Sequence, residues 1–430
     1  MKPTPPRRAL MVGAAVAAAG AVLAALAAAP APADDWPQFR GPRRDGKSAE
    51  TGLLKKWPDG GPKLLWTADG LGTGFTHVSV AKGLVYVTGL VGKRGILRAY
   101  TTGGNLEWRA DYGPEWGALY AGARSIPTVH DGLVYVAGGT GHVACFAAAD
   151  GRPVWSMDAF ERYQAPQVKF GWAESLLVDG ENLILTPCGR KGTMVAVNRR
   201  TGAPVWASPD LGHLSSFCSP LLIEHAGRRL IVTMTDRAVV AFAAQDGKPL
   251  WQHPYKNFRG NHPNTPICQG RLLYIAGGYG EGAVGLELAA DGGSVRQLWE
   301  EARQDPMHGQ AVLVDGYVYA SSHQTAAGKW SCLDLKTGRV AWESGEIGRG
   351  GSVMYADGLL YCYAEDGGVG LVRPRPDRCE VLSAFKVPLG DGPHWAHPVV
   401  ANGRLYIRHG NALMCYDIAA GAAPQSSFGE

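Results

Sequence analysis

A turn that ends in glycine, followed by a short apolar strand, recurs eight times along the chain at intervals of 42 to 49 residues. The glycines are Gly83, Gly132, Gly180, Gly227, Gly270, Gly316, Gly358 and Gly403. A repeat of this length is too small to bury its own apolar face, so it must stack on copies of itself. The period therefore constrains the architecture more than any single motif does.

Each repeat contains four strand-like segments joined by short turns. In the second repeat the segments cover residues 125–129, 133–137, 142–147 and 153–157. Prolines gather in the first segments, at Pro127, Pro220, Pro266 and Pro398, and in the fourth, at Pro153, Pro204 and Pro249. Because proline cannot donate to a β ladder, the first and fourth segments are expected to be the edges of a four-stranded antiparallel blade. A radial array of such blades is a β-propeller, and the repeats predict eight blades over residues 62–418.

The two ends of the repeat array predict how the ring closes. The last repeat ends at about residue 418, before a fourth strand can form, whereas residues 63–66 have the pattern of a fourth strand with no repeat before it. We expect this N-terminal strand to complete the last blade beside residues 412–418, which removes open sheet edges.

Tryptophans and small residues recur at fixed places in the repeats. Seven tryptophans share one position and are expected to pack between neighbouring blades, with Phe385 in their place in the seventh repeat: Trp66, Trp108, Trp155, Trp206, Trp251, Trp299 and Trp342. One position of the third strands is always small, and there Cys145, Cys332 and Cys415 alternate with alanine and glycine. Cysteine is expected to act as a small apolar group at this position. A disulfide among the other five cysteines stays open.

The N-terminus has the pattern of an export signal. Lys2, Arg7 and Arg8 precede an apolar run over residues 10–29 and a small-residue cleavage sequence at 31–33. We expect residues 1–33 to be a cleaved signal peptide, with a membrane span as the alternative and the choice between Sec and twin-arginine export open. Residues 34–61 form an irregular lead segment, expected to lie across the surface and to be anchored by Trp36 and Phe39. The polar tail over residues 419–430 is expected to be disordered.

The charge balance excludes nucleic acid as a partner. The formal net charge is +4, and lysine and arginine are nearly balanced by aspartate and glutamate without any block of like charge. A nucleic-acid binder instead concentrates basic residues on one surface. We expect a monomer in the periplasm or cell envelope.

Two motifs resemble a known family. Residues 332–342, with Asp334, Thr337-Gly338 and Trp342, resemble the pyrroloquinoline quinone (PQQ)-like repeats of bacterial eight-bladed propellers, and the resemblance covers about residues 63–418. Residues 36–41, Trp-Pro-Gln-Phe-Arg-Gly, are similar to the start of exported members of this family. The resemblance implies either a BamB-like assembly scaffold without a cofactor or a quinoprotein alcohol or sugar dehydrogenase that uses PQQ and calcium.

This chain departs from both kinds of relative. The dehydrogenases are expected to carry an adjacent cysteine pair and a calcium site, but the chain has no Cys-Cys sequence and matches no motif for the calcium ligands. The lipid-attachment cysteine of BamB-like proteins is also missing, since the first cysteine is Cys145. We therefore expect a non-catalytic exported scaffold, without a cofactor, that binds an envelope protein, a peptide or a glycan. A small PQQ- and calcium-dependent oxidoreductase is the alternative.

Propellers bind ligands at the channel mouth, where the first strands begin. Counting eight and six residues back from the repeat glycines, and adding a neighbouring histidine, gives these candidates: His77, Arg124, Trp172, Glu174, His262, Asn264, His308, Gln310, His394, Trp395 and His397. We assign no metal site and no catalytic residue, because the pattern His394-x-x-His397 lacks a third ligand.

Each candidate has a second interpretation. The histidines either contact a ligand or a metal, or satisfy backbone groups around a wet channel. Trp172 and Trp395 either stack on a flat ligand or plug the channel. Glu174 is either a general base or calcium ligand, or the partner of Arg124 in an ion pair one blade away.

Overall fold

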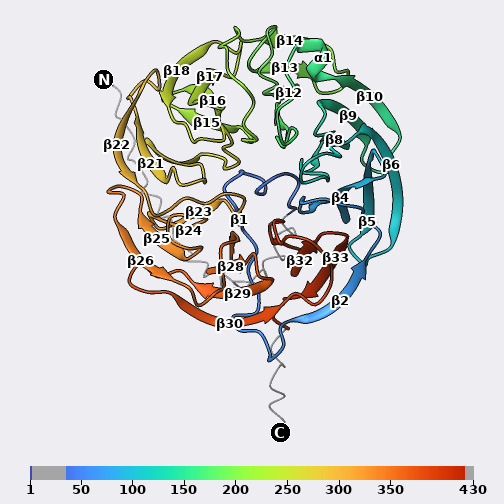
Figure 1. The fold of residues 1–430 in the computed structure, drawn as a ribbon, viewed down its shortest axis with the longest axis vertical. Helices are drawn as coiled ribbons and strands as arrows, with labels where there is room; N and C mark the ends of the chain where they lie inside the picture. The colour runs from blue at the N-terminus through green and yellow to red at the C-terminus, as the bar shows by residue number, and fades with distance from the viewer. Residues whose placement is uncertain (2–34, 422–430) are drawn as a thin grey trace. The chain divides into compact units, whose positions relative to one another are not determined.

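The structure, a computed structural model, describes Met1 and residues 35–421. Apart from Met1, the predicted signal peptide over residues 1–33 lies outside the described residues, as do all but the first three residues of the predicted tail. Residues 35–421 belong to one compact unit, which is a ring of eight sheets (Figure 1). The predicted eight-bladed β-propeller is confirmed.

The first four blades follow one another along the chain, each as four antiparallel strands in sequence order. Blade one contains β3 (Ser79–Ala81), β4 (Leu84–Val91), β5 (Arg94–Thr101) and β6 (Leu106–Pro114). Blade two contains β7 (Thr128–His130), β8 (Leu133–Ala137), β9 (His142–Ala147) and β10 (Pro153–Asp158), followed by the short helix α1 (Ala159–Tyr163). Blade three contains β11 (Leu177–Asp179), β12 (Asn182–Leu185), β13 (Val195–Asn198) and β14 (Pro204–Ala207). Blade four contains β15 (Leu221–His225), β16 (Arg228–Met234), β17 (Ala238–Ala243) and β18 (Pro249–Pro254).

The last four blades repeat this order, with β1 of the lead segment and the N-terminal strand β2 as two additions. Blade five contains β19 (Ile267–Gln269), β20 (Leu272–Ala276), β21 (Ala283–Leu288) and β22 (Val295–Glu301). Blade six contains β23 (Ala311–Val314), β24 (Tyr317–Ser321), β25 (Trp330–Asp334) and β26 (Val340–Ser344). Blade seven contains β27 (Ser352–Ala356), β28 (Leu359–Tyr363), β29 (Gly368–Arg373) and β30 (Glu380–Lys386), and β1 (Lys47–Ser48) pairs with β27 in parallel. Blade eight contains β31 (Val399–Ala401), β32 (Arg404–His409) and β33 (Ala412–Asp417), and its outer strand is β2 (Lys63–Ala68).

Strand β2 closes the ring as predicted. It pairs antiparallel with β33, with Leu64 opposite Tyr416 and Trp66 opposite Cys415. The first and fourth strands are the sheet edges in every blade except blade seven, where β1 lies outside the first strand, and the prolines assigned to these strands lie at or immediately before their first residues. All eight cysteines carry free thiols.

The repeated tryptophans join neighbouring blades. The Trp155 indole N–H donates to the Arg199 carbonyl of the next blade at 2.9 Å, and the Trp108 indole donates to the Ala148 carbonyl at 3.2 Å. The same ring covers a turn glycine of that next blade. A Cβ on Gly151 would lie 2.4 Å from the Trp108 ring, so any other residue would collide with it.

The seventh blade departs from this pattern. Its tryptophan position is held by Ser383, which pairs with Leu371, and a tryptophan of the lead segment fills the space. The Trp57 backbone N–H donates to the Ser383 hydroxyl at 3.0 Å, and its ring packs 5.3 Å from that of Phe385. Phe385 also packs 5.1 Å from Tyr416 of blade eight. The lead segment and Phe385 therefore share the role that one tryptophan has in the other blades.

The hairpin between the first and second strands has two turn residues in every blade, but glycine takes one of two places. In six blades it is the second, and both turn residues have positive φ, as at Asp131 (48°) and Gly132 (75°), which is the type I′ arrangement. In blades three and five the turns are 180–181 and 270–271, and glycine comes first with φ of 59°. Only the first turn residue has positive φ there, as in a type II′ turn.

The lead segment does not lie across the outer surface, contrary to expectation. It enters the channel, where the blue segment that carries β1 crosses the centre of the ring (Figure 1). Trp36 exchanges two backbone hydrogen bonds with Val80, and the Pro37 carbonyl accepts from the backbone N–H of Val129. The physical reason is that the innermost strands leave backbone groups unpaired at the channel wall, and the lead segment supplies partners for them.

Two buried arginines hold the lead segment in place. Arg40 donates to the Ala311 carbonyl of blade six at 2.5 Å. Arg44 donates to the carbonyls of Ser175, Leu176 and Pro220, which belong to blades three and four. Burial lowers the pKa of both guanidinium groups to about 10, so both remain charged at neutral pH. The lead segment thus joins blades on opposite sides of the ring.

Replacing Arg44 by alanine is expected to lower the free energy of unfolding by roughly 3 kcal/mol, because three inner carbonyls lose their donor. The adjacent Arg43→Ala is the control, since the Arg43 side chain is 67% exposed and pairs only with Asp45, and it should change stability by less than about 0.5 kcal/mol. Urea unfolding followed by fluorescence measures both. Equal losses in the two variants would contradict the role of Arg44.

Candidate functional site

A cavity of about 340 Å³ occupies one end of the channel, on the side where the first strands begin. Two rings of side chains, two residues apart along each chain segment that leads into a first strand, form its wall. The inner ring supplies His77, Ile126, Ser175, Ser219, Gln310 and His397, and the outer ring supplies Phe75, Arg124, Ala173, Phe217, Pro263, His308 and Trp395. Phe39 of the lead segment lies against the inner ring, 5.7 Å from the His77 ring and 5.5 Å from the His397 ring.

The structure brings six of the eleven predicted residues together around this cavity: His77, Arg124, His308, Gln310, Trp395 and His397. The other five do not line it, and four of them belong to blades three and five. In these blades glycine is the first turn residue, so counting back from it selects a position one residue too early in both blades. Neighbouring strand residues point to opposite faces. Ser175 therefore faces the cavity in place of Glu174, and Pro263 in place of His262 and Asn264.

The residues that face away have structural surroundings. Trp172 is 1% exposed and packs 5.5 Å from Phe160. The His262 ring lies 5.1 Å from that of Tyr255. The Asn264 side-chain amide donates to the carbonyls of Ala276 and Pro306. His394 stacks 3.6 Å from His409, and its Nδ1 lies 2.5 Å from the Tyr363 hydroxyl.

Glu174 does not pair with Arg124. Its two carboxylate oxygens lie 3.1 and 2.9 Å from the Thr186 backbone N–H, and burial raises its pKa to about 8. Arg124 donates instead to the carbonyls of Gly122, Tyr120 and Phe170. Glu174 is therefore mostly protonated at neutral pH.

This shift makes stability depend on pH. The pKa of an unfolded glutamate is about 4.3, so between that pH and about 8 only the folded chain keeps the Glu174 proton. The contribution of this group to stability is complete below the unfolded pKa and falls as pH rises to about 8. We expect wild-type stability to decline over this window relative to Glu174→Gln, which cannot titrate. Urea unfolding at a series of pH values measures the difference, and parallel curves would disprove the shift.

His77 and His397 are neutral and lie side by side at the inner end of the cavity. Their rings stack at 5.4 Å. Burial, with a smaller effect from the charge of Arg40, lowers the pKa of His77 to about 4. Burial is also the main cause that lowers the pKa of His397 well below its usual value, and the nearby His77 ring adds to this effect. His77 Nδ1 lies 2.8 Å from the Val78 carbonyl, and His397 Nε2 lies 2.7 Å from the His308 carbonyl. Both atoms must donate, because a carbonyl only accepts.

Aromatic rings line the outer part of the cavity. The Trp395 ring lies 5.0 Å from Phe75, 4.3 Å from His308 and 5.6 Å from Tyr120. Tyr120 is 55% exposed and carries the aromatic surface to the rim. The Arg124 guanidinium lies 5.7 Å from the Phe75 ring centre. Sequence reasoning missed Tyr120 because it precedes the first strand by eight residues, and it missed Phe39 because that residue comes from the lead segment.

The lining contains no carboxylate, and this decides whether PQQ with calcium fits. Calcium takes oxygen ligands, among which aspartate and glutamate carboxylates supply the charge. Within residues 35–421 no group of three or more histidine, cysteine, aspartate or glutamate side chains could hold a metal ion. The donor set of the cavity therefore does not fit calcium-bound PQQ.

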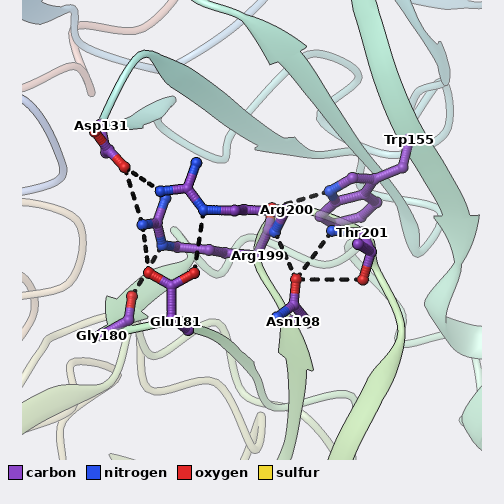
Figure 2. A network of polar contacts seen from close by, with 8 residues as sticks. All are labelled: Asp131, Trp155, Gly180, Glu181, Asn198, Arg199, Arg200 and Thr201. Atoms are coloured by element: carbon purple, nitrogen blue, oxygen red, sulfur yellow. Dashed lines mark hydrogen bonds and ion pairs between the residues drawn. The ribbon is translucent and has the colours of Figure 1, made fainter.

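A second gathering of polar residues joins the hairpins of blades two and three (Figure 2). Arg199 lies between Asp131, at 3.0 Å, and Glu181, at 2.6 Å, and Arg200 bonds the same two carboxylates. Hydrogen bonds from the arginines lower the pKa of both acids. Since each carboxylate already has two cationic partners, this network is structural rather than a ligand site.

Comparison with known proteins agrees with a propeller of this kind. A family model described as outer membrane protein assembly factor BamB matches residues 93–344, more than half of the chain. The chain belongs to this family of PQQ-like repeat propellers.

Two curated relatives are both named outer membrane protein assembly factor BamB. The one from Moranella endobia is 23% identical over 253 residues, which is 55% of this chain and 60% of the relative. The one from Burkholderia pseudomallei is 28% identical over 242 residues, 52% of this chain and 56% of the relative. The chain thus spans a little over half the length of these relatives.

Solved structures share the fold. BamB from Moraxella catarrhalis superposes with a TM-score of 0.59 at 14% identity, covering 84% of this chain and 98% of that one. A europium-containing methanol dehydrogenase gives 0.67 at 13% identity, covering 88% and 90%. Because these identities are low, the likeness shows the fold alone. No helix within residues 35–421 is long and apolar enough to cross a membrane.

Proposed function

We propose that this protein is exported to the cell envelope and acts there as a monomeric, non-catalytic binding scaffold. The observation that carries the proposal is the character of the cavity, whose wall is aromatic and apolar, whose inner histidines His77 and His397 are neutral and whose lining has no carboxylate. Such a wall suits binding rather than acid–base or metal chemistry. The leader pattern in residues 1–33 supports export.

The two curated relatives also support a scaffold. Both curated relatives are named as assembly factors. A rigid ring with a cavity at one end offers a preformed surface, which lowers the entropic cost of binding. The partner is a protein, a peptide or a glycan of the envelope, and the cavity with its aromatic rim is the contact surface.

The cofactor test separates this proposal from the dehydrogenase alternative. The purified protein incubated with PQQ and calcium chloride is expected to show neither a bound-cofactor absorption band nor a higher Tm than with calcium alone. A ligand at a hundred times its Kd would add about 2.7 kcal/mol of stability, which a melting curve resolves. A band and a Tm shift that Trp395→Ala abolishes would establish the quinoprotein instead.

The location of the binding surface can be tested by photo-crosslinking in the producing cell. A photoreactive amino acid replaces Tyr120 at the cavity rim or, as the control, Val205 on the outer strand β14, because the two are similarly exposed at 55% and 51%. We expect an adduct from position 120 only, seen by immunoblot and identified by mass spectrometry. Adducts from position 205, or from both positions equally, would place binding elsewhere.

A further inference from the structure

We infer that the cavity binds a neutral sugar ring, the terminal pyranose of a glycan, with its hydroxyl groups at the inner end and its carbon faces against the aromatic wall. This inference rests on the proposed function and names the ligand class of the same site.

The inner end of the cavity offers hydrogen-bond acceptors. Because His77 Nδ1 donates to the Val78 carbonyl, its Nε2 carries a lone pair, and this atom is buried without a partner in a side chain that is 2% exposed. His397 donates through Nε2, so its Nδ1 is also an acceptor. A buried acceptor without a partner is unfavourable, so the site favours a ligand that donates.

Donors lie in the same inner ring. The Ser175 hydroxyl oxygen accepts from the Ile126 backbone N–H at 3.0 Å, and the Ser219 hydroxyl oxygen accepts from the Ser175 backbone N–H at 2.9 Å. Within residues 35–421 neither hydroxyl donates to another group, so both protons are free to bond a ligand. Two acceptors and two donors around one space match a ring that carries several hydroxyl groups, each of which both donates and accepts.

The wall and the volume fit a flat ring with apolar faces. Phe39 lies at the inner end, and Phe75 and Trp395 lie on the outer wall with their rings 5.0 Å apart. The carbon–hydrogen faces of a pyranose pack on such rings, while its edge carries the hydroxyls. The cavity volume of about 340 Å³ lies at the small end of ligand sites, which span roughly 300–1,000 Å³.

Charge argues for a neutral ligand. The imidazole lone pairs at the inner end repel a carboxylate or a phosphate, and the guanidinium of Arg124 already donates to three backbone carbonyls. A cationic ligand finds no carboxylate in the lining. A tyrosine side chain from a peptide has a single hydroxyl and would leave most of the four polar groups unpaired.

Titration calorimetry with defined trisaccharides tests the inference. The probes are maltotriose, cellotriose and chitotriose, which are uncharged, and trigalacturonate, which is anionic. We expect at least one uncharged probe to bind, and trigalacturonate to bind at least tenfold more weakly. Binding of none of the uncharged probes, or tighter binding of trigalacturonate, would overturn the inference.

Variants connect binding to the named atoms. His77→Phe keeps the ring contacts with Phe39 but removes the acceptor, so affinity for the bound probe should fall at least tenfold. The control is His262→Phe, a histidine that is equally buried but lies outside the cavity, and it should leave affinity unchanged. Ser219→Ala, expected to lose affinity severalfold, serves if His77→Phe does not fold by circular dichroism. Unchanged affinity in the folded cavity variants would overturn the inference.

The failure of this inference can be told apart from failure of the proposed function. If no trisaccharide binds but position 120 still gives an adduct, the cavity rim binds an envelope component of another class and only the sugar assignment is wrong. If position 120 gives no adduct and PQQ stabilises the protein, both are wrong.

Discussion

Pairing between β2 and β33 is the interaction on which the rest of the ring depends. Each blade is a small sheet with two edges, and an eight-bladed ring is stable only when the last blade is joined to the first. Strand β2 makes this joint from the other end of the sequence, and the Trp66 indole then donates to the Thr102 carbonyl of blade one at 2.8 Å. Because the ring is closed, the inner strands are fixed around one axis, and their first residues converge on the cavity.

The lead segment supplies hydrogen-bond partners for backbone groups that face the channel of the ring. The inner strands present backbone carbonyls and N–H groups to this channel. Arg40 and Arg44 satisfy several of these carbonyls, and β1 pairs with the inner strand of blade seven. Arginine suits this role because one guanidinium carries five donors in a plane. The same segment brings Phe39 to the inner end of the cavity, so residues that precede the first blade belong to the candidate site.

The fold was predictable because it depends on a period, whereas the site depends on single residues. Eight repeats with edge prolines define blade number, strand order and closure without any knowledge of side-chain contacts. Counting back from glycine selected His77 and His397, which line the cavity, but in blade five it selected His262 in place of Pro263. A better reference was present in the sequence. A tyrosine recurs at one position of the second strand, as in Tyr86 and Tyr274. It lies eleven residues after the outer-ring residue of the cavity, which is Phe75 in blade one and Pro263 in blade five, whichever type of turn lies between them. The path of the lead segment left no such periodic signal, because it follows from unpaired backbone groups that exist only in the assembled ring.

The register of one blade decides what chemistry the channel wall carries. Blade three presents Ser175 to the cavity and directs Glu174 away from it. There the carboxyl group is desolvated, bonds the Thr186 N–H and has a pKa of about 8, so it is neither a metal ligand nor an anion beside the ligand space. A shift of this segment by one residue would turn Glu174 inward, whereas a change between type I′ and type II′ would not, because both turns have two residues. The same ring of strands can therefore carry a charged, metal-binding wall or a neutral one, and the difference lies in register rather than in fold.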